Sequence, residues 1–272
     1  MAKRNWKAWP KEFKSKLDAT NSIIGISSAG IGGVGLIVSQ PVVAGLGFGA
    51  AVLVAAWSAV TSFPVKLISP EHYLHQKIDD FSLIGTFDPN LTLVGFVGPS
   101  RAGKTTLLNY INYEVESVQE RTDDIYFVVS LNSGNPNLYY GILDGAGQQY
   151  YQQFQIVGKS DIAYIFLDHS SVRDSMSVDF DRLKEHEAFL NQLSGYLRKE
   201  KKQLKSLHFI LNKKDLWETS PQRVDLESWL DNQVGRWKEF SNFPITKSYH
   251  SNFVTADKLK LENELRNLLI KG

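Results

Sequence analysis

The chain has 272 residues, which leaves room for one domain of roughly 180 residues and an appendage. Its formal net charge is +1, so no overall field indicates nucleic acid as a partner. The chain holds no cysteine, which excludes disulfide bonds, zinc–thiolate sites and thiol catalysis.

Residues 1–21 are predicted to form a basic amphipathic arm. Basic residues outnumber acidic ones there and are Lys3, Arg4, Lys7, Lys11, Lys14 and Lys16. Large apolar residues recur at spacings of three and four, which places them on one helical face: Trp6, Trp9, Phe13 and Leu17. Such a helix lies on an anionic membrane surface with its aromatic side inward. A disordered arm and a polybasic contact to nucleic acid are the alternatives, and the tryptophans favour the membrane.

Residues 22–63 contain no charged side chain. The run breaks at Ser39-Gln40-Pro41, which predicts two antiparallel helices, and the second is long enough to cross a hydrocarbon core of about 30 Å. Small residues recur at four-residue spacing and allow close helix packing in lipid: Gly25, Ala29, Gly33, Gly45 and Gly49. We therefore predict a transmembrane or re-entrant helical hairpin. A flexible linker or a soluble buried hairpin is the alternative.

The charge of the arm predicts the topology of this anchor. Basic residues ahead of an apolar run hold the N-terminus in the cytoplasm. An even number of crossings, or a re-entrant hairpin, then returns the rest of the chain to the cytoplasm. A secretory signal is disfavoured because the apolar stretch is too long. We expect a membrane-anchored protein whose main domain faces the cytoplasm.

Residues 64–90 are predicted to form a connector with a short helix over 70–81, and residues 91–272 form the main domain. Strands are expected near 91–97, 125–131, 138–143, 162–168, 206–211 and 245–250. Helices are expected near 104–114, 148–157, 178–202, 224–239 and 257–270. This alternation predicts an α/β fold with a mostly parallel six-stranded sheet that contains one antiparallel hairpin strand.

Residues 98–105 read GPSRAGKT, which matches G-x-x-x-x-G-K-[ST] between a predicted strand and a predicted helix. In such a loop the backbone N–H groups converge on nucleotide phosphates, Lys104 reaches the terminal phosphates, and the Thr105 hydroxyl ligates Mg²⁺. A glycine-rich turn that opens an ordinary helix is the alternative. The residues expected to contact the nucleotide here are Gly98, Ser100, Arg101, Ala102, Gly103, Lys104, Thr105 and Thr106.

A second motif, DGAGQ, follows the strand that ends near residue 143. Asp144 is placed to hold the Mg²⁺ shell, and Gly147 to direct its N–H at a γ-phosphate. Gln148 is placed to orient an attacking water.

A third motif, NKKD, follows the strand that ends at residue 211 and contributes Asn212, Lys213 and Asp215. The Asp215 carboxylate can accept hydrogen bonds from both donors on the edge of guanine. Adenine would leave buried polar groups unpaired, which is how a site rejects a ligand strongly. The motif alone is compatible with a charged loop, and its position behind a phosphate loop favours base recognition.

Over roughly 91–272 the chain resembles the Ras-like P-loop GTPases, because the three motifs occur in that family's order. Ser251-Asn252 looks like the family's weak fifth motif, whose backbone N–H meets the guanine carbonyl, although Asn252 stands where a small alanine is customary. The resemblance also implies a switch threonine that closes on Mg²⁺. Thr122 is the candidate, and Ser117 is the fallback.

The phosphate loop departs from the Ras-like pattern at Arg101, where those proteins carry a small residue. G-x-x-R-x-G-K-[ST] is instead similar to the loop of guanylate-binding proteins and atlastins, which implies an internal arginine finger that acts when two G domains meet. We therefore expect catalytic roles for Gln148, Arg101 and Lys104. A solvent-facing Arg101, or one paired with a switch carboxylate, is the alternative, and Arg121 is a rival finger.

The expected function is a membrane-anchored GTPase that uses GTP, GDP and Mg²⁺, with a protein effector or a second G domain as partner. The first alternative is a receptor or tether that stays GTP-bound, a plan that resembles Arf-like switches and the membrane-bound subunit of the signal-recognition-particle receptor. Membrane remodelling by self-association is a weaker alternative, since 272 residues leave no room for the long stalk of dynamin-related families.

Overall fold

The computed structural model describes residues 4, 9–20, 56, 66–113, 124–134, 136–199 and 204–271. The chain divides into two compact units, Met1–Ile68 and Ser69–Gly272. Nearly all of the predicted hairpin 22–63 lies outside the described residues. Within the part of the chain that is described, no helix combines the length and the apolar composition needed to cross a bilayer.

In the first unit the structure describes helix α1 (Trp9–Thr20). The rings of Trp9 and Phe13 stack with their centroids 5.4 Å apart, as residues one turn apart on a helix can. Lys11 and Lys14 are exposed on the same helix. The helix predicted in the basic arm is therefore present, and one pair of its aromatic residues shares a face.

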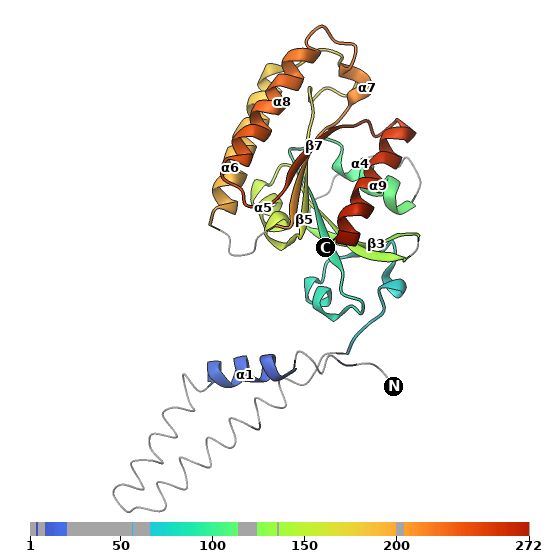
Figure 1. The fold of residues 1–272 in the computed structure, drawn as a ribbon, viewed down its shortest axis with the longest axis vertical. Coiled ribbons are helices and arrows are strands. Elements are labelled where there is room, and N and C mark those ends of the chain that lie inside the picture. Colours follow the sequence, from blue (N-terminus) through green and yellow to red (C-terminus); the bar gives the residue numbers. More distant parts are fainter. Residues whose placement is uncertain are drawn as a thin grey trace, which may run out of the picture. The chain divides into compact units, whose positions relative to one another are not determined.

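The second unit is built on a seven-stranded sheet in the order β1-β3-β4-β2-β5-β6-β7 (Figure 1). The strands are β1 (Lys77–Ile78), β2 (Thr92–Val97), β3 (Tyr126–Asn132), β4 (Leu138–Asp144), β5 (Ile162–Leu167), β6 (Ser206–Leu211) and β7 (Ile245–Tyr249). Strands β2, β4, β5, β6 and β7 pair in parallel, and β3 is antiparallel to both of its neighbours. The predicted α/β class and mostly parallel sheet are confirmed. The predicted strand count was one too low, because the two residues of β1 are too few to show an alternating pattern.

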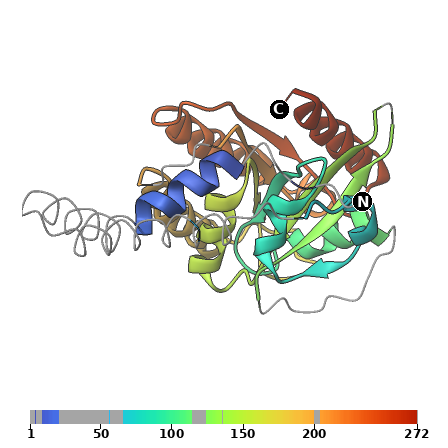
Figure 2. The ribbon, with the colours of Figure 1, turned by 90° about the horizontal axis from the view of Figure 1, so that it is seen from below.

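Helices cover both faces of the sheet (Figures 1 and 2). They are α4 (Lys104–Tyr113), α5 (Tyr150–Lys159), α6 (Phe180–Leu197), α7 (Lys214–Trp217), α8 (Arg223–Lys238) and α9 (Thr255–Lys271). Helices α5, α6 and α8 lie on one face, and α4 and α9 lie on the other (Figure 1). On the second face, Leu107 of α4 and Leu265 of α9 share a core with Phe96 and Tyr164 of the sheet. The five predicted helices are present, and the short α7 was not predicted.

The connector contributes to the sheet rather than only leading to it. The short helix expected over 70–81 is reduced to η2 (Pro70–Tyr73), because the chain then extends into β1. After η3 (Phe81–Thr86), the ring of the fully buried Phe87 packs edge-on against Tyr73 and Phe127, at centroid distances of 5.6 and 6.3 Å. These rings attach the connector to β3.

The central strands explain where a ligand can bind. Every residue of β5 and β6 is buried, as expected for parallel strands covered by helices on both faces. The carboxyl ends of parallel strands meet at one edge of the sheet, and open α/β sheets bind ligands at that edge. The loops that leave β2, β4, β5, β6 and β7 therefore converge there, and they carry the GPSRAGKT, DGAGQ, NKKD and Ser251-Asn252 motifs.

Candidate functional site

The loop between β2 and α4 has a backbone that requires glycine at two positions. Gly98 has φ +143°, and a Cβ there would overlap the carbonyl oxygen of Phe166. Gly103 has φ +95°, and a Cβ there would overlap the side-chain amide of Asn212. Arg101, between them, also has a positive φ, of 66°, which L residues other than glycine adopt only when their surroundings hold them.

Lys104 begins α4 and is folded back across this loop. Its Nζ donates to the carbonyl oxygens of Gly98 (2.7 Å) and Pro99 (3.1 Å), and the residue is 5% exposed. Burial lowers the pKa of Lys104 to about 8, although the nearby carboxylate of Asp144 opposes that change. A positive charge is thus held inside the loop at the N-terminus of a helix, where an anion is favoured.

Asp144, at the end of β4, meets Thr105, as the two motifs predict. Asp144 Oδ2 accepts from the Thr105 hydroxyl (2.9 Å) and the Tyr126 hydroxyl (3.2 Å). Its other oxygen, Oδ1, is buried and accepts no hydrogen bond from the described residues. Burial raises the pKa of this carboxyl, against the effect of Lys104. A buried carboxylate oxygen without a partner, beside a threonine hydroxyl, fits a hard divalent cation such as Mg²⁺.

The remaining metal ligand of the prediction, Thr122, lies outside the described residues, as do Ser117 and Arg121. Thr106 follows Thr105 in the first turn of α4 and is half-buried.

The DGAGQ turn lies directly on the phosphate loop. A Cβ at Gly147 would come 2.7 Å from the Ser100 nitrogen and 2.8 Å from Lys104 Nζ, so only glycine fits there without a shift. Gln148, the next residue, is exposed. The structure therefore brings Gly147 to the loop and places Gln148 at the surface of the turn.

Gln153 of α5, which the sequence analysis missed, connects these two loops. Its Oε1 accepts from the Gly98 N–H (2.9 Å), and its Nε2 donates to the carbonyl oxygens of Gly145 and Ala146 (both 3.1 Å). Gln153 is fully buried, so water does not replace these bonds. The only sequence signal was a polar residue on the otherwise apolar face of a helix.

In the NKKD motif, Asn212 and Lys213 bind backbone carbonyls of neighbouring loops, whereas Asp215 is exposed. Asn212 is buried, and its Nδ2 donates to the Ala102 carbonyl (2.9 Å). Lys213 has φ +59°, and its Nζ donates to the Ser170 carbonyl (2.7 Å). Asp215 is exposed on α7, as a residue that contacts a ligand can be.

The Ser251-Asn252 motif also reaches the phosphate loop. Asn252 Nδ2 donates to the Gly103 carbonyl (2.8 Å), and Asn252 Oδ1 lies 2.9 Å from His250 Nε2. An alanine at this position could not make the bond to Gly103. The Ser251 N–H donates to Asp257 Oδ2 (3.0 Å).

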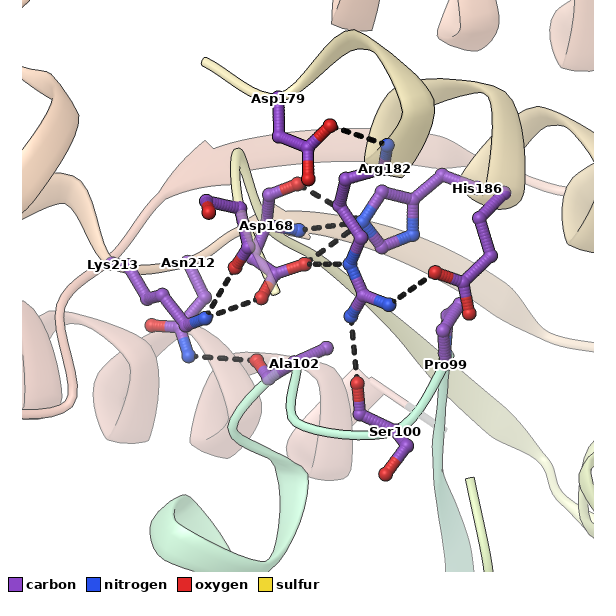
Figure 3. A network of polar contacts seen from close by, with 12 residues as sticks. Pro99, Ser100, Ala102, Asp168, Asp179, Arg182, His186, Asn212 and Lys213 are labelled. Carbon is purple, nitrogen blue, oxygen red and sulfur yellow. Dashed lines mark hydrogen bonds and ion pairs between the residues drawn. The ribbon is translucent and has the colours of Figure 1, made fainter. Parts of the chain in front are cut away.

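A buried charged network behind the phosphate loop was also missed by the sequence analysis (Figure 3). Asp168, at the end of β5, is paired through Oδ1 with Arg182 Nε (2.7 Å) and His186 Nε2 (2.9 Å), and through Oδ2 with Lys213 Nζ (2.5 Å). Burial alone would raise the pKa of Asp168, but the hydrogen bond to His186 and the neighbouring cations hold it well below its ordinary value. Arg182 Nη2 donates to the Ser100 carbonyl (2.7 Å), so the network ends on the phosphate loop.

No protein-family model and no curated protein matches this chain. Among solved structures, a chain of the mammalian SRP receptor shares 18% identity with it, and the match covers 64% of this chain and 97% of that chain, with a TM-score of 0.49.

The lowered pKa of Lys104 predicts a pH-dependent ligand affinity. Phosphate charge favours the ammonium form, so above pH 8 binding must be accompanied by proton uptake. We expect the affinity for GDP, used here as a phosphate-bearing probe, to fall by about tenfold from pH 7 to pH 9. Calorimetry in buffers of different ionisation enthalpy should show proton uptake rising from near zero toward one proton.

The exposed Lys184 of α6 provides the control, because Lys184→Met should leave this profile unchanged. Binding at pH 9 without proton uptake would contradict the assignment to Lys104.

Proposed function

We propose that the Ser69–Gly272 unit is a Mg²⁺-dependent GTP-binding domain of the Ras-like P-loop type. The observation that carries the proposal is the convergence of three sequence motifs on the loop formed by a fourth, GPSRAGKT. Asn252 reaches a carbonyl of that loop across 149 residues of sequence, and Asn212 reaches the adjacent one across 110. Thr105 and Asp144 meet at the same loop, and the second oxygen of Asp144 is buried and accepts no hydrogen bond from the residues that the structure describes.

The phosphates would be bound by the loop and by α4. Lys104 supplies a positive charge, and the N-terminus of α4 adds the partial charge of its free N–H groups. Thr105 and Asp144 would hold Mg²⁺, which when bound neutralises charge on the phosphate oxygens. Because Lys104 and Asp144 are both buried, their interactions with ligand charges are screened less than surface contacts are.

The base would be recognised by α7 and the loop before it. Lys213, in a left-handed conformation, turns the chain so that α7 begins directly at Lys214. The exposed carboxylate of Asp215 is then available to accept both donors of the guanine edge. The N–H of Asn252 is the candidate donor to the guanine carbonyl.

We propose GTP hydrolysis as the reaction of this site. Water attacks the γ-phosphorus, the bond from that phosphorus to the β–γ bridging oxygen breaks, and GDP and phosphate leave. Gln148 would orient the water, and Arg101 would stabilise the charge that develops on the bridging oxygen. Both side chains are exposed in the structure, so a partner surface can push them toward the phosphates. A chain that binds GTP persistently and recruits a protein partner is the alternative.

The Met1–Ile68 unit is proposed as the membrane anchor, with the GTP-binding unit on the cytoplasmic side. The uncharged stretch 22–63 and the stacked Trp9 and Phe13 of α1 support this assignment, because apolar length and interfacial aromatic residues are what a bilayer selects. The exposed Lys11 and Lys14 suit an anionic surface.

Nucleotide choice tests the proposed function directly. GTP and GDP should bind at least about a hundredfold more tightly than ATP, because adenine leaves the edge contacts of Asp215 unpaired. Asp215→Asn should shift the preference toward xanthine nucleotides, since an amide can donate to the extra oxygen of xanthine. Asp225→Asn, at an exposed aspartate of α8, is the matched control. Equal affinities for ATP and GTP in calorimetry would rule out the proposed function.

Hydrolysis tests the roles of Arg101 and Gln148. Arg101→Ala should leave the GTP affinity within about threefold of wild type. It should slow single-turnover hydrolysis by about ten- to a thousandfold, a smaller effect than loss of the arginine has in families that depend wholly on an arginine finger. Gln148→Leu should also slow the reaction. The wild-type rate per molecule should rise with protein concentration, because a facing domain is needed to move an exposed arginine inward.

Arg173→Ala, at another exposed arginine, should leave the hydrolysis rate unchanged. If Arg101→Ala and Gln148→Leu both hydrolyse GTP at the wild-type rate at every concentration, the persistent GTP-bound receptor becomes the better assignment.

Membrane attachment tests the anchor. The full chain should stay with membranes after carbonate and high-salt washing, whereas residues 69–272 should remain in the supernatant. Protease added outside sealed vesicles of native orientation should not cleave the GTP-binding unit. Release of the full chain by salt alone would show that the attachment is peripheral.

A further inference from the structure

We propose that Arg182 is a positioning residue of the phosphate loop, whose guanidinium fixes the peptide between Ser100 and Arg101 so that the Arg101 N–H faces the terminal phosphates. The proposal rests on the proposed function, because it assigns a role in the same site. None of the sequence motifs contains Arg182.

The contact itself is direct and buried. Arg182 extends from α6 to the loop, and its Nη2 donates to the Ser100 carbonyl at 2.7 Å, across 82 residues of sequence (Figure 3). The Arg182 side chain is 3% exposed, and Ser100 at the other end of the bond is partly exposed. The hydrogen bond is charge-assisted, which makes it stronger than a bond between neutral groups.

The rigidity of the peptide bond converts this contact into a constraint on the next residue. A trans peptide is planar, and its C=O and N–H groups point in opposite directions. Because Arg182 holds the Ser100 carbonyl toward α6, the Arg101 N–H must point away from α6. In the proposed site the phosphates lie on that side of the loop. Gly147 approaches the neighbouring backbone nitrogen of Ser100, from which a Cβ on Gly147 would be 2.7 Å away.

The backbone of Arg101 shows that the loop needs such support. Its φ of 66° is unfavourable for a residue with a Cβ and persists only where neighbouring groups hold it. The bond to the carbonyl of the preceding residue provides such a hold. A released peptide could rotate, and the Arg101 N–H would then no longer be directed at the phosphates.

The guanidinium is itself fixed on all three nitrogens. Besides the bond to Ser100, its Nε donates to Asp168 (2.7 Å) and its Nη1 to Glu185 (2.6 Å). Asp168 also pairs with Lys213, the lysine of NKKD (Figure 3). The position of the phosphate loop is therefore connected through two buried side chains to the loop proposed to bind the base.

The test compares ligands that differ in phosphate number. In the full chain, Arg182→Met should weaken GDP and GTP binding by about ten- to a hundredfold, the range expected for loss of a hydrogen bond to a charged group. The affinity for GMP should stay within about twofold, because GMP lacks the phosphates that the Arg101 N–H faces. Arg182→Lys, which keeps the charge and can donate once to Ser100, should recover part of the loss.

Two further variants separate positioning from stability. Lys184→Met removes an exposed lysine of the same helix and should change none of the three affinities. Glu185→Gln weakens the hydrogen bond to Arg182 Nη1 and leaves the pairing of Arg182 with Asp168 in place. It should give a smaller loss of affinity than Arg182→Met, again for GDP and GTP but not for GMP. If circular dichroism shows that Arg182→Met does not fold, the affinities of Glu185→Gln decide whether Arg182 positions the loop.

The outcomes separate the two proposals. If the wild-type chain binds neither GDP nor GTP, the proposed function fails whatever Arg182 does. If wild type binds GDP and the folded variants bind it equally well, the positioning role is overturned. Equal losses for GMP, GDP and GTP would also overturn it, since they indicate a general loss of structure.

Discussion

The site depends on hydrogen bonds that buried side chains make to the backbone carbonyls of the loop between β2 and α4. Lys104 binds the carbonyls of Gly98 and Pro99, and Arg182 binds that of Ser100. Further along the loop, Asn212 donates to the carbonyl of Ala102, and Asn252 donates to the carbonyl of Gly103. The carbonyls of Pro99, Ser100, Ala102 and Gly103 are each followed by a residue with an N–H, and holding such a carbonyl fixes the direction of that N–H because the peptide group is planar. The loop thereby obtains its shape from the surrounding protein.

The same arrangement concentrates charge in a small buried volume. Lys104, Asp144, Asp168 and Arg182 are all at most 5% exposed. Removing such groups from water is costly unless each has a partner. Asp168 has three partners and its pKa is held low, which marks it as a structural anion. The pKa values of Lys104 and Asp144 instead move toward their neutral forms, and phosphate beside one and a cation beside the other would favour the charged forms.

The sheet explains why these groups meet. Strands β2, β4, β5 and β6 lie side by side and end at one edge, so the residues just beyond them are neighbours. Asp144 and Asp168 each follow directly on the buried part of a strand, and Asn212 follows β6. Helix α6 then crosses behind the loop and brings Arg182 and His186, one turn apart, to Asp168.

The sequence by itself determined the α/β class, the approximate bounds of six strands and five helices, and the motifs that gather at the edge of the sheet. These features depend on local patterns: apolar runs, helical periodicity, and short stretches such as GPSRAGKT and NKKD. The sequence also showed an asparagine at position 252 but not its role, because that role depends on the hydrogen bond from Asn252 to the Gly103 carbonyl, which only the structure shows.

Only the tertiary structure decided which residues outside the motifs support the site. Gln153 and Arg182 contact the phosphate loop across 55 and 82 residues of sequence, and neither belongs to a short pattern. Strand β1 was missed for a related reason, since two residues acquire their conformation from pairing with β3. Such contacts depend on how helices and strands pack, and packing is a property of the whole chain that no local stretch encodes.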